Sequence, residues 1–430
     1  MNEIFRQRVN AYFKDDAEKY LDLISKPCTQ GFFLNTTKAS KQQILDLIDF
    51  PYSSSDLTEY SFYHSSDGIG KTKVYELGLI YPQEIAASIP STKIDTKGVK
   101  LVVDLCSAPG GKTINVLNKI SKDSICICND VSYKRALTLS SNLERLGLDN
   151  VVITSKDTKE LSYQLENYAD LVILDAPCSG EGMIRKYPEI LYDYSINNIN
   201  NLASIQKELL EDAYRILKCG GQLLYSTCTY AFEEDENQII QFLNNHEDME
   251  IIDLGNSYSS TLKGTIKLSP LTNTEGQFIC LMRKTRGLSH SINLLKPIKE
   301  KIVDDFISDN LNIDKYYLYK IDNRYYMSII PLPDLKNKII RNGIYVGDII
   351  NKRFEPNHNF YRSNSLISKY KYSYDLSNEE YDKFISGNEI RVNLENHYYQ
   401  LTYSGLSLGF GKCSNKQLKN KYPKGLRIHN

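Results

Sequence analysis

Two short polar segments each carry a cysteine directly after an apolar run: LDAPCSGEGM at 174–183 and YSTCTY at 225–230. The apolar runs predict buried parallel strands, and Asp175 then falls where the first of these strands ends. In open α/β sheets, ligands and catalytic groups gather outside the carboxyl ends of the strands. We therefore expect Cys178 and Cys228 to share one pocket, although they lie far apart in the sequence.

The segment CSAPGGK at 106–112 predicts a loop between a strand and a helix. Its glycine pair removes two Cβ atoms, so a ligand can approach the backbone N–H groups at the helix N-terminus. Asp130 closes the next predicted strand, where an acid can hydrogen-bond ribose hydroxyls, and Asp157 follows the third, within reach of an adenine amino group. With Asp175 they favour a nucleotide-type cofactor. The loop does not fit the phosphate-binding pattern G-x-x-x-x-G-K-S/T, so a cofactor without a triphosphate is favoured.

A thiol attacks only as its thiolate, and a free cysteine with a pKa of about 8.5 is only slightly ionised at neutral pH. Cys178 or Cys228 would therefore need help from turn N–H groups or from a cation such as Lys112 or Arg185. Carbon 5 of cytosine is too electron-poor to attack a methyl donor, but a thiolate that adds at carbon 6 makes it enamine-like. A carboxyl group at N3 stabilises the adduct as a general acid would, and a second thiol can assist product release. These residues point to methyl transfer onto cytosine and leave open which thiol attacks.

From Lys100 onward the chain alternates between apolar strands and amphipathic helices, which predicts a mostly parallel, doubly wound sheet. One helix is expected to begin after Ser132 and to stop at Gly147. Others are expected at 205–217, ended by a Gly-Gly pair, and at 233–243, where an acidic first turn suits the helix dipole. Strands are expected at 101–105, 124–128, 151–154, 171–174, 222–225 and, later, 276–282.

The pattern changes on both sides of this core. An amphipathic helix is expected over residues 4–24, a small α+β unit over 28–90 and Tyr-rich strands beyond 297. We therefore expect four domains: an N-terminal RNA-binding or accessory domain at 1–95, the core at 96–285, a first C-terminal α+β domain at 286–370 and a domain of short strands at 371–430.

Composition limits the classes of protein that this chain can represent. The net charge of −1 gives no global attraction to nucleic acid, so any basic footprint must be local. Nine scattered cysteines without a C-x-x-C pair indicate a reducing compartment rather than a disulfide framework. Cys126 and Cys128 point to one face of a strand, but without a nearby histidine they predict no metal site. The N-terminus holds acids and no long apolar run, so we expect neither a signal peptide nor a membrane span, and a cytoplasmic protein.

Several segments match one family of enzymes. Between about residues 80 and 285 the chain resembles the RsmB/RsmF (Nol–Nop–Sun type) RNA cytosine-5 methyltransferases. The matching segments are YPQE at 81–84, DLCSAPGGKT at 104–113, ND at 129–130, LERLG at 143–147, LDAPCSGEGMIRK at 174–186, Gln206 with the helix after it, LKCGGQLLYSTCT at 217–229 and EEDEN at 233–237.

The resemblance implies an α/β fold with a Rossmann-like class I methyltransferase core, and it assigns roles within the site. Cys228 would be the nucleophile, Cys178 would aid product release and Asp175 would hold the cytosine. S-adenosylmethionine would be held by Cys106, Ser107, Ala108, Pro109, Gly110, Gly111, Lys112, Asp130, Asp157 and Asp175.

The last stretch of the chain, GFGKCSNKQLKNKYPKGLR at 409–427, is similar to the C-terminal PUA-like RNA-binding module of the RsmF branch. A basic, tyrosine-bearing surface also suits RNA backbone and base stacking. Two positions depart from the family pattern: Phe32 stands where an arginine is usual, and GFGK stands where GWGK is common. The basic residues of the tail are Lys412, Lys416, Lys419, Lys421, Lys424 and Arg427.

The RsmF branch acts on small-subunit (16S) ribosomal RNA, so the resemblance implies that substrate, bound by a monomer that needs neither metal nor membrane. Two other hypotheses stay open. The first is the same chemistry on transfer RNA, and the second is a non-catalytic, RNA-binding ribosome-assembly factor. Intact Cys228, Asp175 and CSAPGGK count against the second, since an idle core need not keep them.

Overall fold

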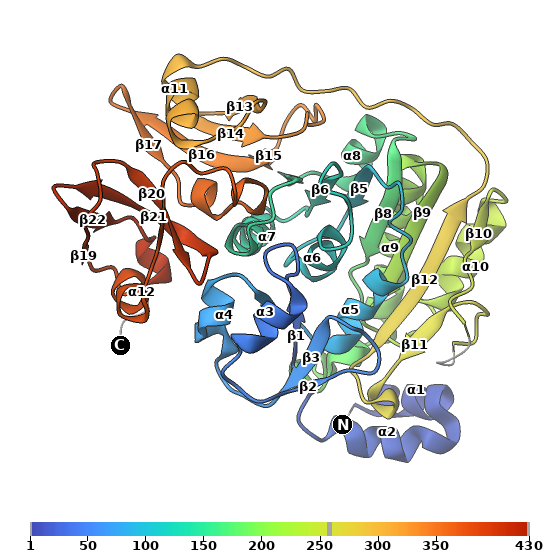
Figure 1. Ribbon diagram of the computed structural model, residues 1–430. Coiled ribbons are helices and arrows are strands. Elements are labelled where there is room, and N and C mark those ends of the chain that lie inside the picture. The colour runs from blue at the N-terminus through green and yellow to red at the C-terminus, as the bar shows by residue number, and fades with distance from the viewer. Residues whose placement is uncertain (1, 256–259, 428–430) are drawn as a thin grey trace.

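The computed structural model describes residues 2–255 and 260–427 (Figure 1). Its centre is a nine-stranded sheet with the order β10-β12-β9-β8-β5-β6-β7-β15, in which β11 also pairs with β12. The order of the parallel strands reverses between β5 and β8, which confirms the predicted Rossmann-like core. The parallel strands are β5 (Leu101–Asp104), β6 (Ile125–Asn129), β7 (Val151–Thr154), β8 (Ala169–Asp175) and β9 (Leu217–Thr227).

Antiparallel strands extend this sheet at both edges. β12 (Gln277–Lys284) lies against β9, as the sequence predicts for a late strand, and carries β10 (Met249–Ile251) and β11 (Ile266–Leu268). At the other edge β15 (Ile339–Asn342) pairs with β7. The main sheet therefore continues past residue 285, where we expect the core to end, because a later strand completes it.

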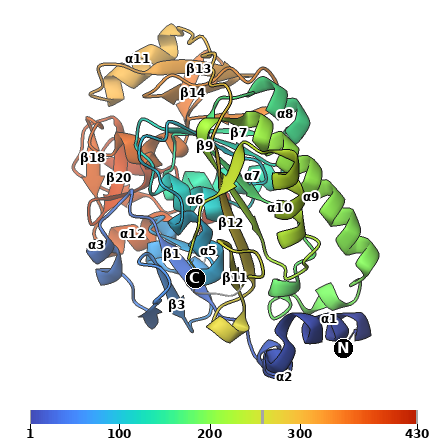
Figure 2. The same ribbon diagram turned by 90° about the vertical axis from the view of Figure 1, so that its right-hand side faces the viewer.

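Helices cover both faces of the sheet (Figure 2). Side chains alternate along each strand, so Val102 packs with α6 and α7 while Val103 packs with α8 and α9. Each such buried side chain contributes about 1.5–3 kcal/mol to folding. None of the helices in the described residues is long and apolar enough to cross a membrane. One face carries α5 (Ile85–Thr92), α6 (Gly111–Leu117) and α7 (Tyr133–Leu146), and the other carries α8 (Thr158–Gln164), α9 (Ile196–Ile216) and α10 (Glu236–Asn245).

The cap signals place α7 correctly, but the predicted start of α9 and its predicted stop signal were wrong. α7 lies between its predicted caps, Ser132 and Gly147. α9 begins at Ile196 rather than at 205, because Ser195 caps it and its first turns are too polar to show an apolar stripe. It ends at Ile216, where the chain enters β9 directly, so the Gly-Gly pair that we expect to end it lies inside the strand.

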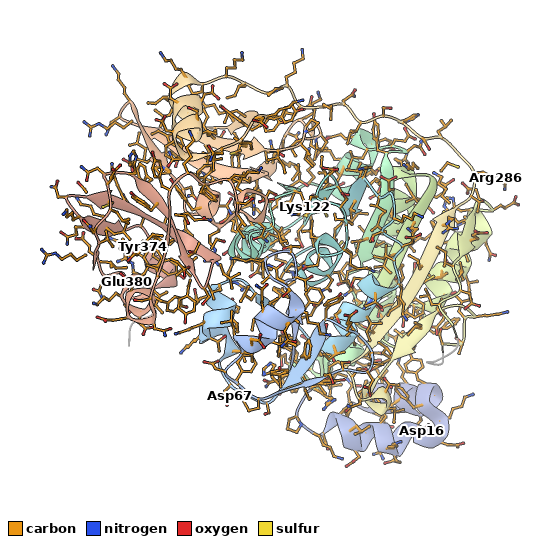
Figure 3. The ribbon with its side chains drawn as sticks, viewed as in Figure 1. Asp16, Asp67, Lys122, Arg286, Tyr374 and Glu380 are labelled. Atoms are coloured by element: carbon orange, nitrogen blue, oxygen red, sulfur yellow. The ribbon has the colours of Figure 1, made fainter. Side chains whose placement is uncertain are left out.

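The N-terminal part consists of two units. The helix expected over 4–24 is broken at residues 14–16, where Lys14 has a φ of 47°. We call its two halves, α1 (Glu3–Phe13) and α2 (Ala17–Ile24), the N-terminal helix pair, and Figure 3 marks Asp16 at the break. The second unit is a sheet of order β2-β3-β1-β4, formed by β1 (Gly31–Leu34), β2 (Tyr52–Ser54), β3 (Ser61–His64) and β4 (Ile80–Pro82), with α3 (Lys41–Asp46) and α4 (Lys73–Glu76).

Phe32 lies on β1, in the core of this second unit. Its side chain is fully buried and stacks on Phe62, with the ring centroids 5.7 Å apart. The position at which the family usually has an arginine therefore serves packing in this chain and presents no surface to RNA.

The C-terminal part contains two further sheets, beside α7 and the N-terminal unit (Figure 1). Arg362 is fully buried where three parts of the chain meet, and its guanidinium donates to the carbonyl oxygens of Glu76, Arg145 and Leu408. Tyr374 and Glu380, marked in Figure 3, belong to the last sheet and its helix. The elements are α11 (Lys301–Asn310), β13 (Tyr317–Ile321), β14 (Arg324–Ser328), β16 (Ile344–Ile350) and β17 (Arg353–Pro356), then β18 (Ser373–Asp375), α12 (Asn378–Ile385), β19 (Ile390–Arg391), β20 (Tyr398–Tyr403), β21 (Leu406–Ser414) and β22 (Gln417–Asn420).

Candidate active site

Cys178 and Cys228 lie side by side at the carboxyl ends of two neighbouring parallel strands. Their Sγ atoms are 3.2 Å apart, and the Cys228 N–H points at Cys178 Sγ from 3.3 Å. The register of β8 and β9 brings the segments after them, 176–183 and 228–231, to the same edge of the sheet, and we call these segments the thiol loops. Both cysteines line a cavity of about 880 Å³ together with Asp175. The structure thus brings together the two thiols and the carboxyl group that the sequence singles out.

The surroundings of Cys178 favour its protonated form. Its contact with the Cys228 sulfur and its burial raise the pKa of the Cys178 thiol well above the ordinary value. A protonated thiol suits a proton donor better than an attacking nucleophile. Arg185, which we expect as a cation beside the thiols, instead forms an ion pair with Glu275 at 3.1 Å.

Asp175 is held from two sides at the end of β8. Lys112 Nζ lies 2.8 Å from its Oδ2, and Ser226 Oγ donates to its Oδ1 at 2.8 Å. The Lys112 side chain is only 8% exposed, whereas Asp175 is 36% exposed. The carboxyl group is therefore fixed in orientation while one side of it faces the cavity. Lys112, which we expect as help for a thiol, pairs with this carboxyl group instead.

The loop at 106–112 reaches the cavity through its first residues. Cys106 and Ala108 line the cavity. Ser107 is buried behind them, and its N–H and hydroxyl both donate to the Asn129 carbonyl, at 2.9 Å and 3.0 Å. This pair of hydrogen bonds ties the loop to the end of β6.

The glycine pair of the loop is required by packing against other side chains. Gly110 has a φ of 118°, and a Cβ there would lie 2.9 Å from Leu139 Cδ1. A Cβ on Gly111 would lie 2.8 Å from Gln83 Nε2. The sequence predicts that Gly111 leaves space for a ligand. In the structure the side chain of Gln83, which lies just before α5, occupies that space. Pro109, between Ala108 and this pair, is exposed.

Asp130 and Asp157 reach the same cavity from the ends of β6 and β7. Asp130 is buried, its Oδ1 accepts the Ser132 N–H at 3.0 Å and its Oδ2 lies 3.2 Å from Arg135. Asp157 is exposed and caps α8, because its Oδ1 accepts the Lys159 N–H at 3.0 Å. Asp157 therefore has a structural role in addition to its place on the cavity wall.

Glu234 and Gln206 are buried and hold the thiol loops, a role that the sequence did not predict. Glu234 Oε2 accepts the Ser179 N–H at 3.0 Å and the Gln206 side-chain amide at 2.8 Å. The same amide nitrogen donates to the Pro177 carbonyl at 2.8 Å, and Ser179 Oγ lies 2.7 Å from Thr229 Oγ1. Burial raises the pKa of Glu234. This network fixes the first loop and joins it to the second.

The sequence holds a signal that could have identified Glu234 and its neighbour Asp235 as buried acids. We expect a helix from 233 whose acidic first turn suits its dipole, but α10 begins at Glu236, and Glu234 and Asp235 precede it and are fully buried. The expectation was wrong because a helix dipole explains one or two acids, not a run of four before an apolar stripe. The additional acids, which the dipole does not explain, were the signal in the sequence that some of them are buried.

Asp104, at the end of β5, is a further buried acid that sequence reasoning passed over. Its Oδ2 accepts the Thr113 hydroxyl at 2.6 Å, which ties β5 to α6. Burial raises the pKa of Asp104 to about 7. The Asp104 carboxyl group, two residues before the loop at 106–112, therefore keeps its proton to a higher pH than an ordinary aspartate does.

The described residues contain no group of three or more histidine, cysteine, aspartate or glutamate side chains that could hold a metal ion. Cys126 and Cys128 are fully buried, and their sulfurs are 3.5 Å apart. They pack in the sheet as small apolar side chains.

The chain matches two family models and a curated relative. The model described as 16S rRNA methyltransferase RsmB/F matches residues 92–283, and the methyltransferase RsmF PUA domain matches residues 371–428. The chain is also 33% identical to the tRNA (cytosine(49)-C(5))-methyltransferase of Pyrococcus abyssi (strain GE5 / Orsay), over 66% of this chain and 97% of that protein. The chain belongs to the RsmB/F family of methyltransferases. It is an RNA cytosine-C5 methyltransferase, and its methyl donor is S-adenosylmethionine.

Other comparisons extend this result over the rest of the methyltransferase. It is 26% identical to the Ribosomal RNA small subunit methyltransferase F of Shewanella piezotolerans (strain WP3 / JCM 13877), over 95% of this chain and 93% of that protein. A solved methyltransferase homolog protein from Pyrococcus horikoshii covers 66% of this chain and 95% of its own, with a TM-score of 0.59 and 29% identity. NSun6 from Pyrococcus horikoshii with SFG shares the fold, with a TM-score of 0.58 and 20% identity, over 66% of this chain and 98% of its own.

The cavity of the methyltransferase fits its cofactor. Asp130 Oδ2 is buried and, apart from its 3.2 Å ion pair with Arg135, accepts no hydrogen bond within the described residues, so it can receive one from a ribose hydroxyl. Ala176 and Pro177 supply apolar wall next to Cys178. A nucleoside can therefore meet both a polar anchor and apolar surface in the same cavity that holds the thiols.

Proposed function

We propose that this methyltransferase forms 5-methylcytosine in small-subunit (16S) ribosomal RNA through a covalent bond between Cys228 and carbon 6 of the base. Cys178 aids release of the product and Asp175 holds the cytosine at N3. The observation that carries the proposal is the 3.2 Å separation of the two sulfurs beside Asp175. A single attacking thiol would not need a second thiol in contact with it.

The residues act in a defined order. As Cys228 Sγ adds to carbon 6, the proton of its thiol passes to N3 by way of the Asp175 carboxylate, and carbon 5 then becomes nucleophilic. When bound, S-adenosylmethionine supplies the methyl group to carbon 5. A base then removes the proton from carbon 5, and the bond between Cys228 Sγ and carbon 6 breaks. Cys178, whose thiol keeps its proton, lies 3.2 Å from the departing sulfur and can give that proton to it. Lys112 offsets the charge of Asp175 between cycles.

The cofactor is held, in this proposal, by the loop 106–112 and by three acids. Cys106 and Ala108 line the cavity, while Ser107, Pro109, Gly110, Gly111 and Lys112 keep the loop in shape or orient Asp175. Asp130 receives the ribose hydroxyls, since it is buried and its Oδ2, although ion-paired with Arg135, accepts no hydrogen bond within the described residues. Asp157 reaches the adenine amino group from the far side of the same cavity.

Ribosomal RNA is favoured over transfer RNA by the length of the relatives. The transfer RNA enzyme of Pyrococcus abyssi aligns with 66% of this chain, whereas the small-subunit RNA methyltransferases of Shewanella piezotolerans and Klebsiella pneumoniae (strain 342) each align with 95%. The RsmF PUA match at 371–428 lies in the additional part. We also propose the four expected domains as functional units, a monomer, and action in the cytoplasm.

Bisulfite sequencing of RNA from a deletion strain tests the substrate. One or more cytosines of 16S ribosomal RNA should lose methylation, while transfer RNA stays methylated. Loss confined to transfer RNA would establish the alternative substrate. If the deletion strain assembles small subunits normally but lacks the methyl group, the non-catalytic assembly role is excluded as the main function.

A further inference from the structure

The N-terminal helix pair packs on the thiol loops and not on the sheet that follows it in the chain. Phe5 and Tyr20, from α1 and α2, are fully buried in one cluster with Ile184 and Tyr230. Ile184 lies just after the first thiol loop, and Tyr230 lies in the second. Figure 1 shows the pair at the foot of the main sheet, beneath β11. The first residues of the chain therefore form part of the wall behind the active site.

One arginine of this helix pair contacts two acids, one from each side of the site. Arg8 donates to both carboxylate oxygens of Glu233, at 3.0 Å and 2.6 Å. Its Nε also lies 3.6 Å from Glu181 Oε1. The Arg8 side chain is 15% exposed and Glu181 is 1% exposed, so the pair is largely withdrawn from water. An ion pair in such surroundings has a fixed orientation. Removing one partner is costly, because it leaves the other charge buried and unpaired.

Glu181 in turn joins the two thiol loops. It lies three residues after Cys178, and its Oε2 accepts the N–H of Tyr230, two residues after Cys228, at 3.1 Å. The next residue, Gly182, donates its N–H to the Cys228 carbonyl at 2.9 Å. The position of the Glu181 carboxylate therefore sets the backbone on both sides of the sulfur pair.

We propose that Arg8 is a positioning residue for the methyl transfer: by holding Glu181 and Glu233 it fixes the spacing of Cys178 and Cys228. Arg8 lines no part of the cavity and touches neither sulfur. It acts through the carboxylate that spans the loops. The inference rests on the proposed roles of the two thiols, but it concerns a segment far from the cofactor loop.

The consequence is a selective loss of turnover. Without the guanidinium, Glu181 is a buried carboxylate with less compensation, and the thiol loops relax around it. A displacement of about 1 Å at a reacting group can lower a rate by about a hundredfold. The cofactor loop and Asp130 lie at the ends of β5 and β6, which the helix pair does not contact, so cofactor binding should not change.

The test compares Arg8→Ala, Arg8→Lys and Arg6→Ala in the full chain. Arg6 lies on the same helix and pairs with Glu18 at 3.4 Å, with side chains 53% and 78% exposed, so it is the matched control. We expect kcat to fall about tenfold or more in Arg8→Ala, with the Kd for S-adenosylhomocysteine within about twofold of the parent. Arg8→Lys should recover part of the loss, because it keeps the charge but not the two-pronged contact. Arg6→Ala should match the parent.

A double-variant cycle separates positioning from general stability. If Arg8 acts through Glu181, then Arg8→Ala should cost less turnover in a Glu181→Gln background than in the parent. An unchanged kcat in Arg8→Ala, or equal losses of kcat and cofactor affinity, would refute the inference. Should Arg8→Ala fail to fold, Arg8→Lys decides: a lowered kcat at parental melting temperature supports the inference, and a parental kcat rejects it. All of these experiments measure methylation itself. If Cys228 is not the nucleophile, Cys228→Ala keeps its activity, whereas the Arg8 variants test only the positioning role.

Discussion

Lys112 Nζ lies 2.8 Å from Asp175 Oδ2, and this ion pair joins the cofactor loop to the carboxyl group beside the thiols. The ion pair therefore links the loop proposed to hold the methyl donor to the residue proposed to hold the cytosine. The residue that orients the carboxyl group stands in the first turn of α6, directly after the glycines of the loop that borders the cofactor cavity. A change at either partner should therefore affect chemistry more than folding.

Asp175→Asn should lower kcat by about a hundredfold or more, because an amide neither passes a proton to N3 nor balances the Lys112 charge. Steady-state methylation of the RNA substrate measures the effect. Asp170→Asn is the control, since Asp170 lies on the same strand but pairs with Lys218 at the opposite end. Equal losses in the two variants would mean that the strand, not the carboxyl group, had been disturbed.

Cys228→Ala should abolish methylation, and Cys178→Ala should retain the first methyl transfer but accumulate a covalent protein–RNA adduct. The adduct appears as a slowly migrating band on a denaturing gel. Cys219→Ala serves as the control, because Cys219 lies on β9 far from its carboxyl end and does not line the cavity. An adduct that forms in Cys228→Ala and depends on Cys178 would reverse the two roles.

Lys419→Glu with Lys421→Glu should weaken RNA binding and leave S-adenosylmethionine binding unchanged. Both side chains are exposed, and Lys419 pairs across the strands with Lys412, so they form one basic strip. Each phosphate contact that is lost should reduce the slope of log K against log salt concentration by about 0.7 on single-stranded RNA. Charge reversal of the exposed Lys97 and Lys122 should have no such effect. RNA affinity equal to that of the parent would exclude this strip as a footprint.

Asp104→Asn should remove a pH dependence of stability. Burial raises the pKa of Asp104 from 3.8 to about 7, so the folded state binds the proton more tightly than the unfolded state. The contribution of this group to the free energy of unfolding is therefore greatest below its unfolded pKa and declines as the pH rises towards about 7. Urea denaturation at intervals from pH 4 to pH 8 should show the variant gaining on the parent across this window. A constant difference, like that expected of the exposed Asp123→Asn, would contradict the assignment.

Much of the core could be predicted from short-range signals. The alternation of apolar strands with amphipathic helices, and the caps Ser132 and Gly147, reflect local physics and survive in the structure. Predictions failed where tertiary contacts override local preference. The first helix breaks at 14–16, where its two halves pack against the thiol loops. The early start of α9 has a different cause, since it comes from a local signal that was missed, the cap Ser195.

By itself the sequence determined which residues are candidates for the chemistry: two thiols, a carboxyl group and a loop, each recognisable because it follows an apolar strand. Only the tertiary structure decided which partners hold them. Lys112 pairs with Asp175 rather than with a sulfur, Gln206 and Glu234 clamp the first thiol loop, and Arg8 reaches the site from the far end of the chain. The reason is physical: strand periodicity fixes where a side chain emerges, but a buried charge is satisfied by whichever group folding brings within reach, and sequence separation carries no record of that distance.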